Sequence, residues 1–255
     1  IGPASSSLHV LEQMIQAGMN VARLNFSHGS YKEHKALIAT IRRVEKKTGE
    51  PIAIMQDLQG PKLRVGVLPD KGVKLAAGEI INFDSNRKNY AVDFIPIDYD
   101  LGKYVKIGEK LLLDDGQMEV KVLNVSQHKI EGRVIVGGVL TSHKGINAPE
   151  SKLHGASLGE KDIMDVRFGV ENGVDLIALS FVASAKDVLD LRYLIKKFEK
   201  EMKLAGEPIM IVAKIERAEA VKNIKEIVDA ADALMVARGD LGIEIPAQKV
   251  PLAQK

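Results

Sequence analysis

The sequence predicts an α/β fold of parallel strands, with a separate all-β segment inserted into it. Short apolar runs recur along the chain, and each of them ends in polar residues. Helical segments separate most of these runs, but the helical period is absent from about residue 65 to residue 147. Runs that are apolar throughout are typical of strands covered on both faces, and strands that alternate with helices form right-handed βαβ units.

Five runs are predicted to be strands of the parallel sheet. They are "MNVARLNFSHG" (19–29), "PIAIMQDLQG" (51–60), "VDLIALSFV" (174–182), "PIMIVAKIE" (208–216) and "ALMVARGDLG" (233–242).

The helices between these strands carry recognisable start and stop signals. Ser30 is predicted to cap a helix over 31–49, with Glu33 completing a capping box and Gly49 ending the helix. Ser184 and Asp187 give the same signal for a second helix. This second helix is predicted over 185–206, and two further ranges with helical spacing are 160–173 and 218–231.

The inserted segment reads as short strands joined by turns. "KLLLDDGQMEVKVLNV" (110–125) predicts two strands around an Asp-Gly turn, in which Asp114 and Asp115 form the hairpin connection. "HKIEGRVIVGGVL" (128–140) continues in the same way. We therefore expect a first sheet segment over 1–64, a β domain over 65–147 and a second sheet segment over 148–255.

Composition sets limits on function. The 255 residues are 45% hydrophobic and 27% charged, with a net charge of +2. This balance gives no overall field that favours nucleic acid or an anionic membrane, and no apolar run approaches the roughly 18 residues of a membrane span. Cysteine is absent, which excludes disulfides and thiol catalysis in this chain and fits a reducing compartment.

Polar residues gather where the predicted strands end. Since residues i and i+2 face the same side of a strand, three sets are each expected to share a face: Arg23 with Asn25 and Ser27, Lys214 with Glu216, and Arg238 with Asp240. Asp57 and Ser180 also end their strands. In (β/α) barrels this edge carries the active site. The alternative is that each polar residue merely solvates its strand end.

The types of these residues indicate a chemistry. Glu216 and Asp240 are hard oxygen ligands suited to Mg²⁺ or Mn²⁺, although they could instead pair with Lys214 and Arg238. Lys214 and Arg23 are cations suited to phosphate oxygens. A metal, several cations and no obvious nucleophile favour phosphoryl transfer by positioning and charge neutralisation.

Other motifs are absent or weak. The chain has neither a G-x-x-x-x-G-K-[ST] nor a G-x-G-x-x-G motif, and its six histidines show no H-E-x-x-H spacing that would indicate zinc. Gly239, between Arg238 and Asp240, would let backbone N–H groups approach an anion closely.

The sequence resembles the pyruvate kinase family along essentially its whole length. The segments that carry the resemblance are "IGPAS", "NVARLNFSHG", "QDLQGPKLRVG", "LLLDDG", "KGIN", "EKD", "FGVENGVDLIALSFV", "AKIE" and "MVARGDLGIEIPAQKV…AQK". The resemblance implies a (β/α)₈ TIM-type barrel, incomplete in this chain, with an inserted β lid domain. The last two barrel strands, a carboxyl-terminal domain and the threonine that helps protonate the enolate have no counterpart here.

The resemblance also implies ligands and roles. Phosphoenolpyruvate and ADP would be the substrates, and Mg²⁺ or Mn²⁺ would be held by Glu216 and Asp240. Arg23 and Lys214 would contact the phosphoryl group, with Lys214 stabilising it during transfer. The other implied substrate contacts are Ser180, Phe181, Ala237, Arg238 and Gly239, and the implied nucleotide contacts are Asn25, Ser27, His28, Arg64 and Lys144. A cytoplasmic location and a homotetramer of the full-length protein are implied as well.

One departure from the family pattern concerns K⁺. The K⁺ of many family members lies beside residues that correspond to Asn25, Ser27, Asp57 and Leu58. In those members a threonine stands at the position of Leu58 and a glutamate at that of Lys62. We therefore expect the Lys62 ammonium to replace K⁺, so that K⁺ is not required.

Two other functions stay open at this stage. One is a Mg²⁺-dependent oxo-acid lyase on a similar barrel, and the other is a non-catalytic binding fragment. A lyase would need the carboxylates at the sheet edge but no nucleotide lid, so the inserted domain with Arg64 and Lys144 argues against it.

Overall fold

The computed structural model describes residues 1–61, 63–151 and 158–255. The chain divides into two compact units. Unit 1 contains Ile1–Pro61, Ala156–Ile215 and Asn223–Met235, and unit 2 contains Lys62–Gly155, Glu216–Lys222 and Val236–Lys255. The domain boundaries expected from the sequence stay a prediction. No helix among the described residues is long and apolar enough to cross a membrane.

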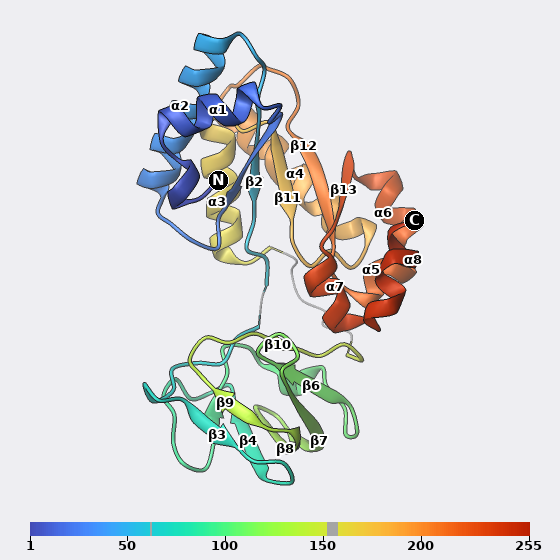
Figure 1. The fold of residues 1–255 in the computed structure, drawn as a ribbon. Coiled ribbons are helices and arrows are strands. Elements are labelled where there is room, and N and C mark those ends of the chain that lie inside the picture. The colour runs from blue at the N-terminus through green and yellow to red at the C-terminus, as the bar shows by residue number, and fades with distance from the viewer. Residues whose placement is uncertain (62, 152–157) are drawn as a thin grey trace. The chain divides into compact units, whose positions relative to one another are not determined.

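A five-stranded sheet forms the centre of unit 1 (Figure 1). The last residue of its final strand, Val236, is assigned to unit 2. The strands of the sheet, in spatial order, are β1 (Val21–Asn25), β2 (Ala53–Asp57), β11 (Leu176–Leu179), β12 (Met210–Ile215) and β13 (Ala233–Val236). The pairs β1–β2, β2–β11 and β11–β12 are parallel. Each strand lies within one of the five predicted runs, so the α/β prediction with a parallel sheet is confirmed.

One helix precedes β1, and other helices separate the later strands of unit 1 along the chain. They are α1 (Leu8–Gln16), α2 (Tyr31–Thr48), α3 (Glu160–Glu171), α4 (Ala185–Glu201) and α6 (Ile224–Ala230). α1 packs against α2, α3 against α4, and α4 against α6 (Figure 1). The start and stop signals of α2 are confirmed, because Ser30 and Glu33 form the capping box and Gly49 ends the helix in the left-handed conformation.

Two helix predictions differ from the structure in extent. α4 ends at Glu201, before Gly206, and Lys203 adopts a positive φ of 53° just beyond that end. The helix expected over 218–231 is interrupted at Asn223 and forms α5 (Ala218–Lys222) and α6. The Asn223 side chain donates a hydrogen bond of 2.8 Å to the Ala183 carbonyl, a long-range contact that helical spacing cannot reveal.

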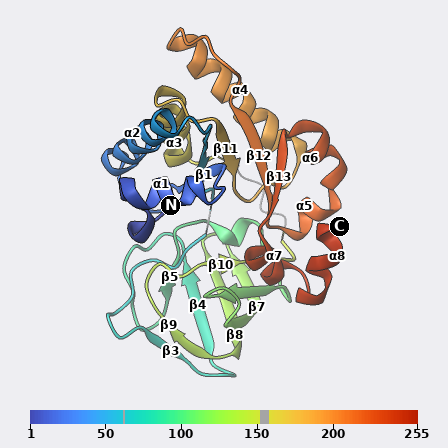
Figure 2. The same cartoon turned by 45° about the horizontal axis from the view of Figure 1, so that its top comes forward.

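The β strands of unit 2 form a six-stranded sheet and a separate pair (Figures 1 and 2). The larger sheet has the order β10 (Ile146–Asn147), β6 (Lys110–Leu113), β7 (Met118–Ser126), β8 (Lys129–Val136), β4 (Ile80–Asp84) and β5 (Ile95–Pro96). β3 (Val73–Leu75) pairs with β9 (Gly138–Leu140). These pairs are antiparallel except β4–β5, which confirms the inserted all-β segment.

The β6–β7 turn and the core of the β segment follow the sequence closely. Asp114 and Asp115 take positive φ values of 50° and 54° in the turn, and Gln117 N–H donates to the Asp114 carbonyl at 3.1 Å. The hairpin interpretation of this pair is therefore confirmed. Apolar side chains that alternate along the strands pack into one core, which includes Phe83, Leu111, Leu113, Val120, Ile130 and Leu140.

The remaining short helices complete the chain. They are the 3₁₀ turns Pro3–Ser5, Leu101–Lys103 and Ala247–Lys249, together with α7 (Arg238–Glu244) and α8 (Val250–Gln254).

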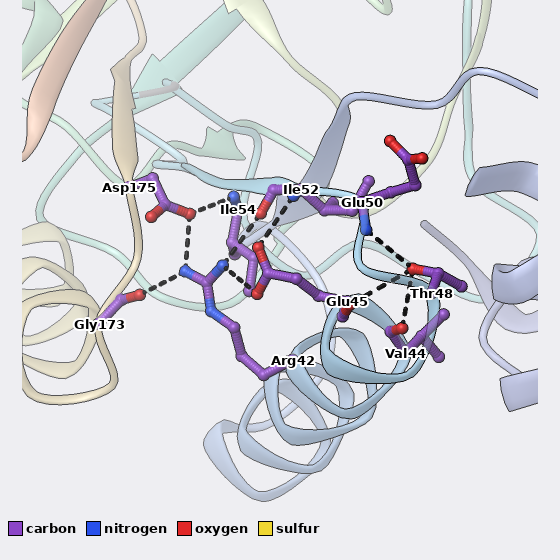
Figure 3. Close-up of polar contacts among 9 residues, drawn as sticks. All are labelled: Arg42, Val44, Glu45, Thr48, Glu50, Ile52, Ile54, Gly173 and Asp175. Atoms are coloured by element: carbon purple, nitrogen blue, oxygen red, sulfur yellow. Dashed lines mark hydrogen bonds and ion pairs between the residues drawn. The ribbon is translucent and has the colours of Figure 1, made fainter. Parts of the chain in front are cut away.

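Arg42 on α2 ties three segments together at the amino ends of β2 and β11 (Figure 3). Its Nη1 donates to Glu45 Oε2 at 3.1 Å and to the Ile52 carbonyl at 3.0 Å. Its Nη2 donates to the Gly173 carbonyl at 3.0 Å and to Asp175 Oδ2 at 2.7 Å. The planar fork of an arginine suits such paired acceptors. We call these five residues the Arg42 clamp.

The carboxylates of the clamp also hold backbone of β2. Asp175 Oδ2 accepts from Ile54 N–H at 2.6 Å, and Glu45 Oε1 accepts from Ile52 N–H at 3.0 Å (Figure 3). The clamp therefore fixes where β2 and β11 begin, and the parallel register then fixes where they end.

Candidate active site

The predicted polar residues of unit 1 meet at the carboxyl edge of the parallel sheet. Asn25 at the end of β1 is paired in register with Asp57 at the end of β2, and Ala178 of β11 is paired with Asp57 as well. Ser180 follows β11 directly, and Lys214 is the penultimate residue of β12. The expectation that these strand ends form a common edge is confirmed.

Asp57 lies between two cations that come from different strands. Arg23 Nε and Nη2 contact Asp57 Oδ2 at 2.6 and 2.5 Å, and Lys214 Nζ contacts Asp57 Oδ1 at 3.2 Å. Asp57 is 1% exposed and Lys214 8% exposed, so each buried charge is compensated by an opposite one. Two cations share one carboxylate here, and these three side chains together carry a net positive charge.

Ser180 links Lys214 to the main chain of the next segment. Lys214 Nζ donates to Ser180 Oγ at 2.7 Å, and the Ser180 hydroxyl donates to the Leu58 carbonyl at 2.7 Å. Phe181 follows with a positive φ of 57°, an uncommon conformation for a bulky residue. The sequence predicted Ser180 at this edge, but it could not predict the hydrogen bond to Lys214.

The loop after β1 carries three predicted nucleotide contacts and is held by its own hydrogen bonds. Asn25 Oδ1 accepts from Ser27 N–H at 3.0 Å, and the Asn25 carbonyl accepts from His28 N–H at 3.3 Å. His34 Nε2 lies 2.9 Å from the His28 carbonyl, and the His34 ring stacks on Phe26 with a centroid distance of 4.1 Å. These contacts give the loop a defined shape in the structure.

A buried carboxylate that the sequence analysis missed supports the same loop. Asp165 on α3 is fully buried and accepts from Tyr31 Oη at 2.7 Å and from Lys161 Nζ at 2.6 Å. Lys161 Nζ also donates to the Phe26 carbonyl at 2.8 Å. Burial, together with the hydrogen bond to Asp165, raises the pKa of Tyr31 to about 12. The signal was present, because Asp165 lies three residues after the buried Asp162 and four before the buried Gly169, a spacing that puts it on the buried face of α3.

Asp162, also on α3, holds the chain where it leaves β2. Its carboxylate accepts from Gly60 N–H at 3.0 Å and from Gly159 N–H at 2.9 Å, and burial raises the pKa of Asp162. Gly60 has a φ of +68°, and a Cβ there would lie 2.8 Å from Ser180 Cβ. Only glycine fits this position without displacing its neighbours.

The predicted metal and anion residues of unit 2 lie in two short segments. Glu216 follows β12 directly and is 2% exposed. α7 starts at Arg238 with Ala237 as its N-cap, and Arg238 and Gly239 are exposed. Within the described ranges no group of three or more histidine or acidic side chains could hold a metal ion. The assignment of Glu216 and Asp240 to Mg²⁺ stays a prediction.

The shared-face argument from strand geometry was wrong for two sets of residues. β1 ends at Asn25, so Ser27 lies in the turn beyond the strand and the argument does not extend to it. Arg238 and Asp240 were expected to share a face of a strand, but β13 ends at Val236 and both residues lie in the first turn of α7. Residues two apart on a helix point in widely different directions, so the shared-face argument does not apply to this pair.

The predicted nucleotide contacts Arg64 and Lys144 lie on neighbouring segments, because Arg64 is bridged to Gly145. Arg64 Nη1 donates to the His143 carbonyl at 3.1 Å. Lys144 Nζ contacts Asp114 Oδ1 at 2.7 Å, and this hydrogen bond raises the pKa of Lys144. Lys62, predicted to replace K⁺, lies outside the described residues.

Comparison with known proteins gives a family over the whole length. The family model described as "Pyruvate kinase, barrel domain" matches residues 1–255. Curated pyruvate kinases from Geobacillus stearothermophilus and Sporosarcina psychrophila are 44% and 43% identical to it over 258 residues, and one from a strain of Thermococcus litoralis is 41% identical over 256 residues.

The chain spans about half the length of these relatives. Each match covers 100% of this chain, but only 43% of the first two proteins and 52% of the third. The resemblance inferred from the motifs is confirmed, and the alternative of a lyase from another family loses its basis.

Proposed function

Because the chain belongs to the pyruvate kinase family, we propose that it carries residues for phosphoryl transfer from phosphoenolpyruvate to ADP, giving pyruvate and ATP in the last step of glycolysis. The observation that best supports this proposal is the convergence of Arg23 and Lys214 on Asp57 at the carboxyl edge of the sheet. The two cations keep a net positive charge around their shared carboxylate, and this charge favours a dianionic phosphoryl group beside them.

The chemistry asks for positioning and charge. A transferring phosphoryl group spreads negative charge over three equatorial oxygens, and the protein needs to neutralise that charge rather than form a covalent bond. Lys214 is the residue we assign to this task in the transition state. Arg23, whose side chain is 48% exposed, binds the phosphoryl group from the open side. Asp57 keeps the two cations close despite their mutual repulsion.

The rest of the pocket is assigned by resemblance. Ser180 and Phe181 wall the substrate, and the backbone N–H groups of Ala237, Arg238 and Gly239 bind its carboxylate where α7 begins.

The nucleotide side is assigned in the same way. Asn25 at the end of β1, with Ser27 and His28 in the loop after it, contacts the phosphates of ADP. Arg64 and Lys144 contribute from the β segment. The defined shape of the 25–28 loop supports the first three assignments.

Glu216 and Asp240 fit a hard divalent cation by their chemistry. Both are carboxylates, and Mg²⁺ prefers about six oxygen ligands, of which only one or two are usually carboxylates. Glu216 is 2% exposed, so a cation that it held would be bound below the protein surface. When bound, Mg²⁺ or Mn²⁺ supplies charge neutralisation for phosphoryl and enolate oxygens.

K⁺, location and assembly rest on the sequence and the resemblance alone. We propose that K⁺ is not required, because Lys62 stands in the sequence where K⁺-dependent members of the family carry a glutamate, and Leu58 stands where they carry a threonine. We also propose a cytoplasmic location and a homotetramer for the full-length protein.

A coupled assay tests the proposal. Pyruvate formation from phosphoenolpyruvate should require ADP and Mg²⁺ in the full-length protein, and the 255-residue chain should be assayed beside it. A full-length protein that binds both substrates but forms no pyruvate would support a non-catalytic binding function instead.

A further inference from the structure

The Ser180 hydroxyl makes two hydrogen bonds, one with the Lys214 ammonium and one with the Leu58 carbonyl. A serine hydroxyl has one proton and two lone pairs. Its proton is directed to the Leu58 carbonyl at 2.7 Å, so its oxygen meets the Lys214 ammonium as an acceptor, also at 2.7 Å. Ser180 is 2% exposed, so water does not readily replace either bond.

The other end of this connection is the segment that leaves β2. Leu58, whose carbonyl accepts the hydrogen bond from Ser180, is 1% exposed. Its own N–H donates to the Ala178 carbonyl at 3.0 Å. Two residues further on, Gly60 lies so close to Ser180 that a Cβ at Gly60 would meet Ser180 Cβ at 2.8 Å. Ser180 therefore contacts both Lys214 and the backbone through which the chain passes toward the β segment.

We propose that Ser180 is a positioning residue that holds the Lys214 ammonium in its transfer direction and ties that direction to the 58–60 backbone. Asp57 attracts the ammonium at 3.2 Å, but charge attraction is weakly directional. The neutral hydroxyl adds a directional hydrogen bond of 2.7 Å to the ammonium. This inference rests on the proposed function of Lys214.

The kinetic test uses Ser180→Ala in the full-length protein. Loss of the hydroxyl should lower kcat roughly tenfold, because a displacement near 1 Å is enough to weaken a transition-state contact strongly. KM for phosphoenolpyruvate should stay within about twofold, because the ground-state contact with the phosphoryl group is less demanding. Ser184→Ala is the matched control, since Ser184 lies on the same segment and its hydroxyl contacts Asp187 at 3.5 Å.

A double-mutant cycle separates positioning from direct substrate contact. In a Lys214→Met background, Ser180→Ala should lower kcat by less than about twofold further, because the two residues act as one unit. An equal loss in both backgrounds would mean that Ser180 acts as a wall of the pocket, and it would overturn the proposal. An unchanged kcat for Ser180→Ala alone would overturn it too.

A measurement without turnover decides the same point if the protein proves inactive. An amine-reactive ester should label Lys214 several times faster in Ser180→Ala than in the wild type or in Ser184→Ala, as followed by peptide mass spectrometry. Equal labelling in all three proteins would show that the hydroxyl does not hold the ammonium. An inactive wild type with faster labelling in Ser180→Ala would refute the proposed function and leave the positioning contact standing.

Discussion

Asp57 is a single carboxylate shared by Arg23 and Lys214, and this sharing sets what each cation contributes. Arg23 is anchored by two short contacts and is half exposed, which suits a residue that binds substrate as it arrives. Lys214 is buried beside Asp57 and Ser180, where the dielectric constant is low and a charge acts strongly. We therefore expect the two cations to affect binding and turnover differently.

Lys214→Met in the full-length protein is predicted to lower kcat by about 100-fold or more, with a smaller effect on KM, because an ammonium that matters chiefly in the transition state contributes to kcat. Steady-state kinetics with varied phosphoenolpyruvate measure both constants. Lys186→Met serves as a control, because its side chain is 79% exposed and contacts Asp190 one turn further along α4. A change confined to KM would mean that Lys214 binds only ground-state phosphate.

The Lys62 position gives a second prediction at this scale. Wild-type activity should be nearly the same in K⁺-free and K⁺-containing buffers of matched ionic strength, because a tethered ammonium has a high effective concentration. Lys62→Glu, with or without Leu58→Thr, should create dependence on K⁺. Lys71→Glu makes the same charge change at an exposed site of the β segment and should not. A wild type that is nearly inactive without K⁺ would contradict the replacement.

At the scale of elements, the Arg42 clamp holds α2 to the starts of β2 and β11. Arg42→Lys should lower the free energy of unfolding by about 1–3 kcal/mol, because a lysine cannot reproduce the planar fork and leaves carbonyl or carboxylate acceptors without a donor. Urea unfolding followed by circular dichroism measures the change. Arg43→Lys, at the exposed neighbouring position, should change it by less than about 0.5 kcal/mol. Equal changes in the free energy of unfolding for the two variants would show that the contacts of Arg42 stabilise the protein no more than those of the exposed Arg43.

The exit from β2 depends on a glycine. Placing an alanine in the left-handed backbone conformation costs ~1–2 kcal/mol. Gly60→Ala should destabilise unit 1 by more than this, because the new Cβ also collides with Ser180 and Phe181. Gly49→Ala isolates the conformational cost, since Gly49 has a φ of +75° and a Cβ added there would meet no heavy atom within 4 Å. Equal denaturation midpoints for the two variants would rule out the steric contribution.

Elements with local signals could be predicted from the sequence. Apolar runs identified all five strands of the sheet in unit 1, and the Ser30 capping box identified the start of α2. Both signals depend on residues that are neighbours in the chain. The interruption at Asn223 and the early start of α7 at Arg238 could not be predicted. The first depends on a hydrogen bond to Ala183, 40 residues away, and the second on where the sheet ends.

The candidate site shows the same division. Arg23, Asp57, Ser180 and Lys214 could be placed on one edge because parallel strands bring their carboxyl ends together. The contact of Tyr31 with Asp165, 134 residues along the chain, could not be inferred, because a polar residue on a helix does not reveal its partner. Distances such as the 2.7 Å between Lys214 and Ser180 follow from packing alone.

At the scale of the whole molecule, phosphoryl transfer in the proposed reaction has to exclude water, and the β segment is the part that we expect to close over the site. Its tethers would be the residues near 61–66 and 145–149. Small-angle scattering of the full-length protein should give a smaller radius of gyration with Mg²⁺, phosphoenolpyruvate and ADP than without them. Mg²⁺ alone is the control. Superimposable profiles with and without substrates would refute closure.

The Arg42 clamp has a consequence for how this sequence can diverge. Two of its four acceptors are the carbonyl oxygens of Ile52 and Gly173, and every amino acid supplies such an oxygen. Substitution at those two positions therefore leaves acceptors in place wherever the new side chain suits the local backbone. Evolutionary constraint then falls on the side chains of Arg42, Glu45 and Asp175. Neutral substitutions should therefore accumulate at Ile52 and Gly173, while the arginine and the two carboxylates change together or not at all.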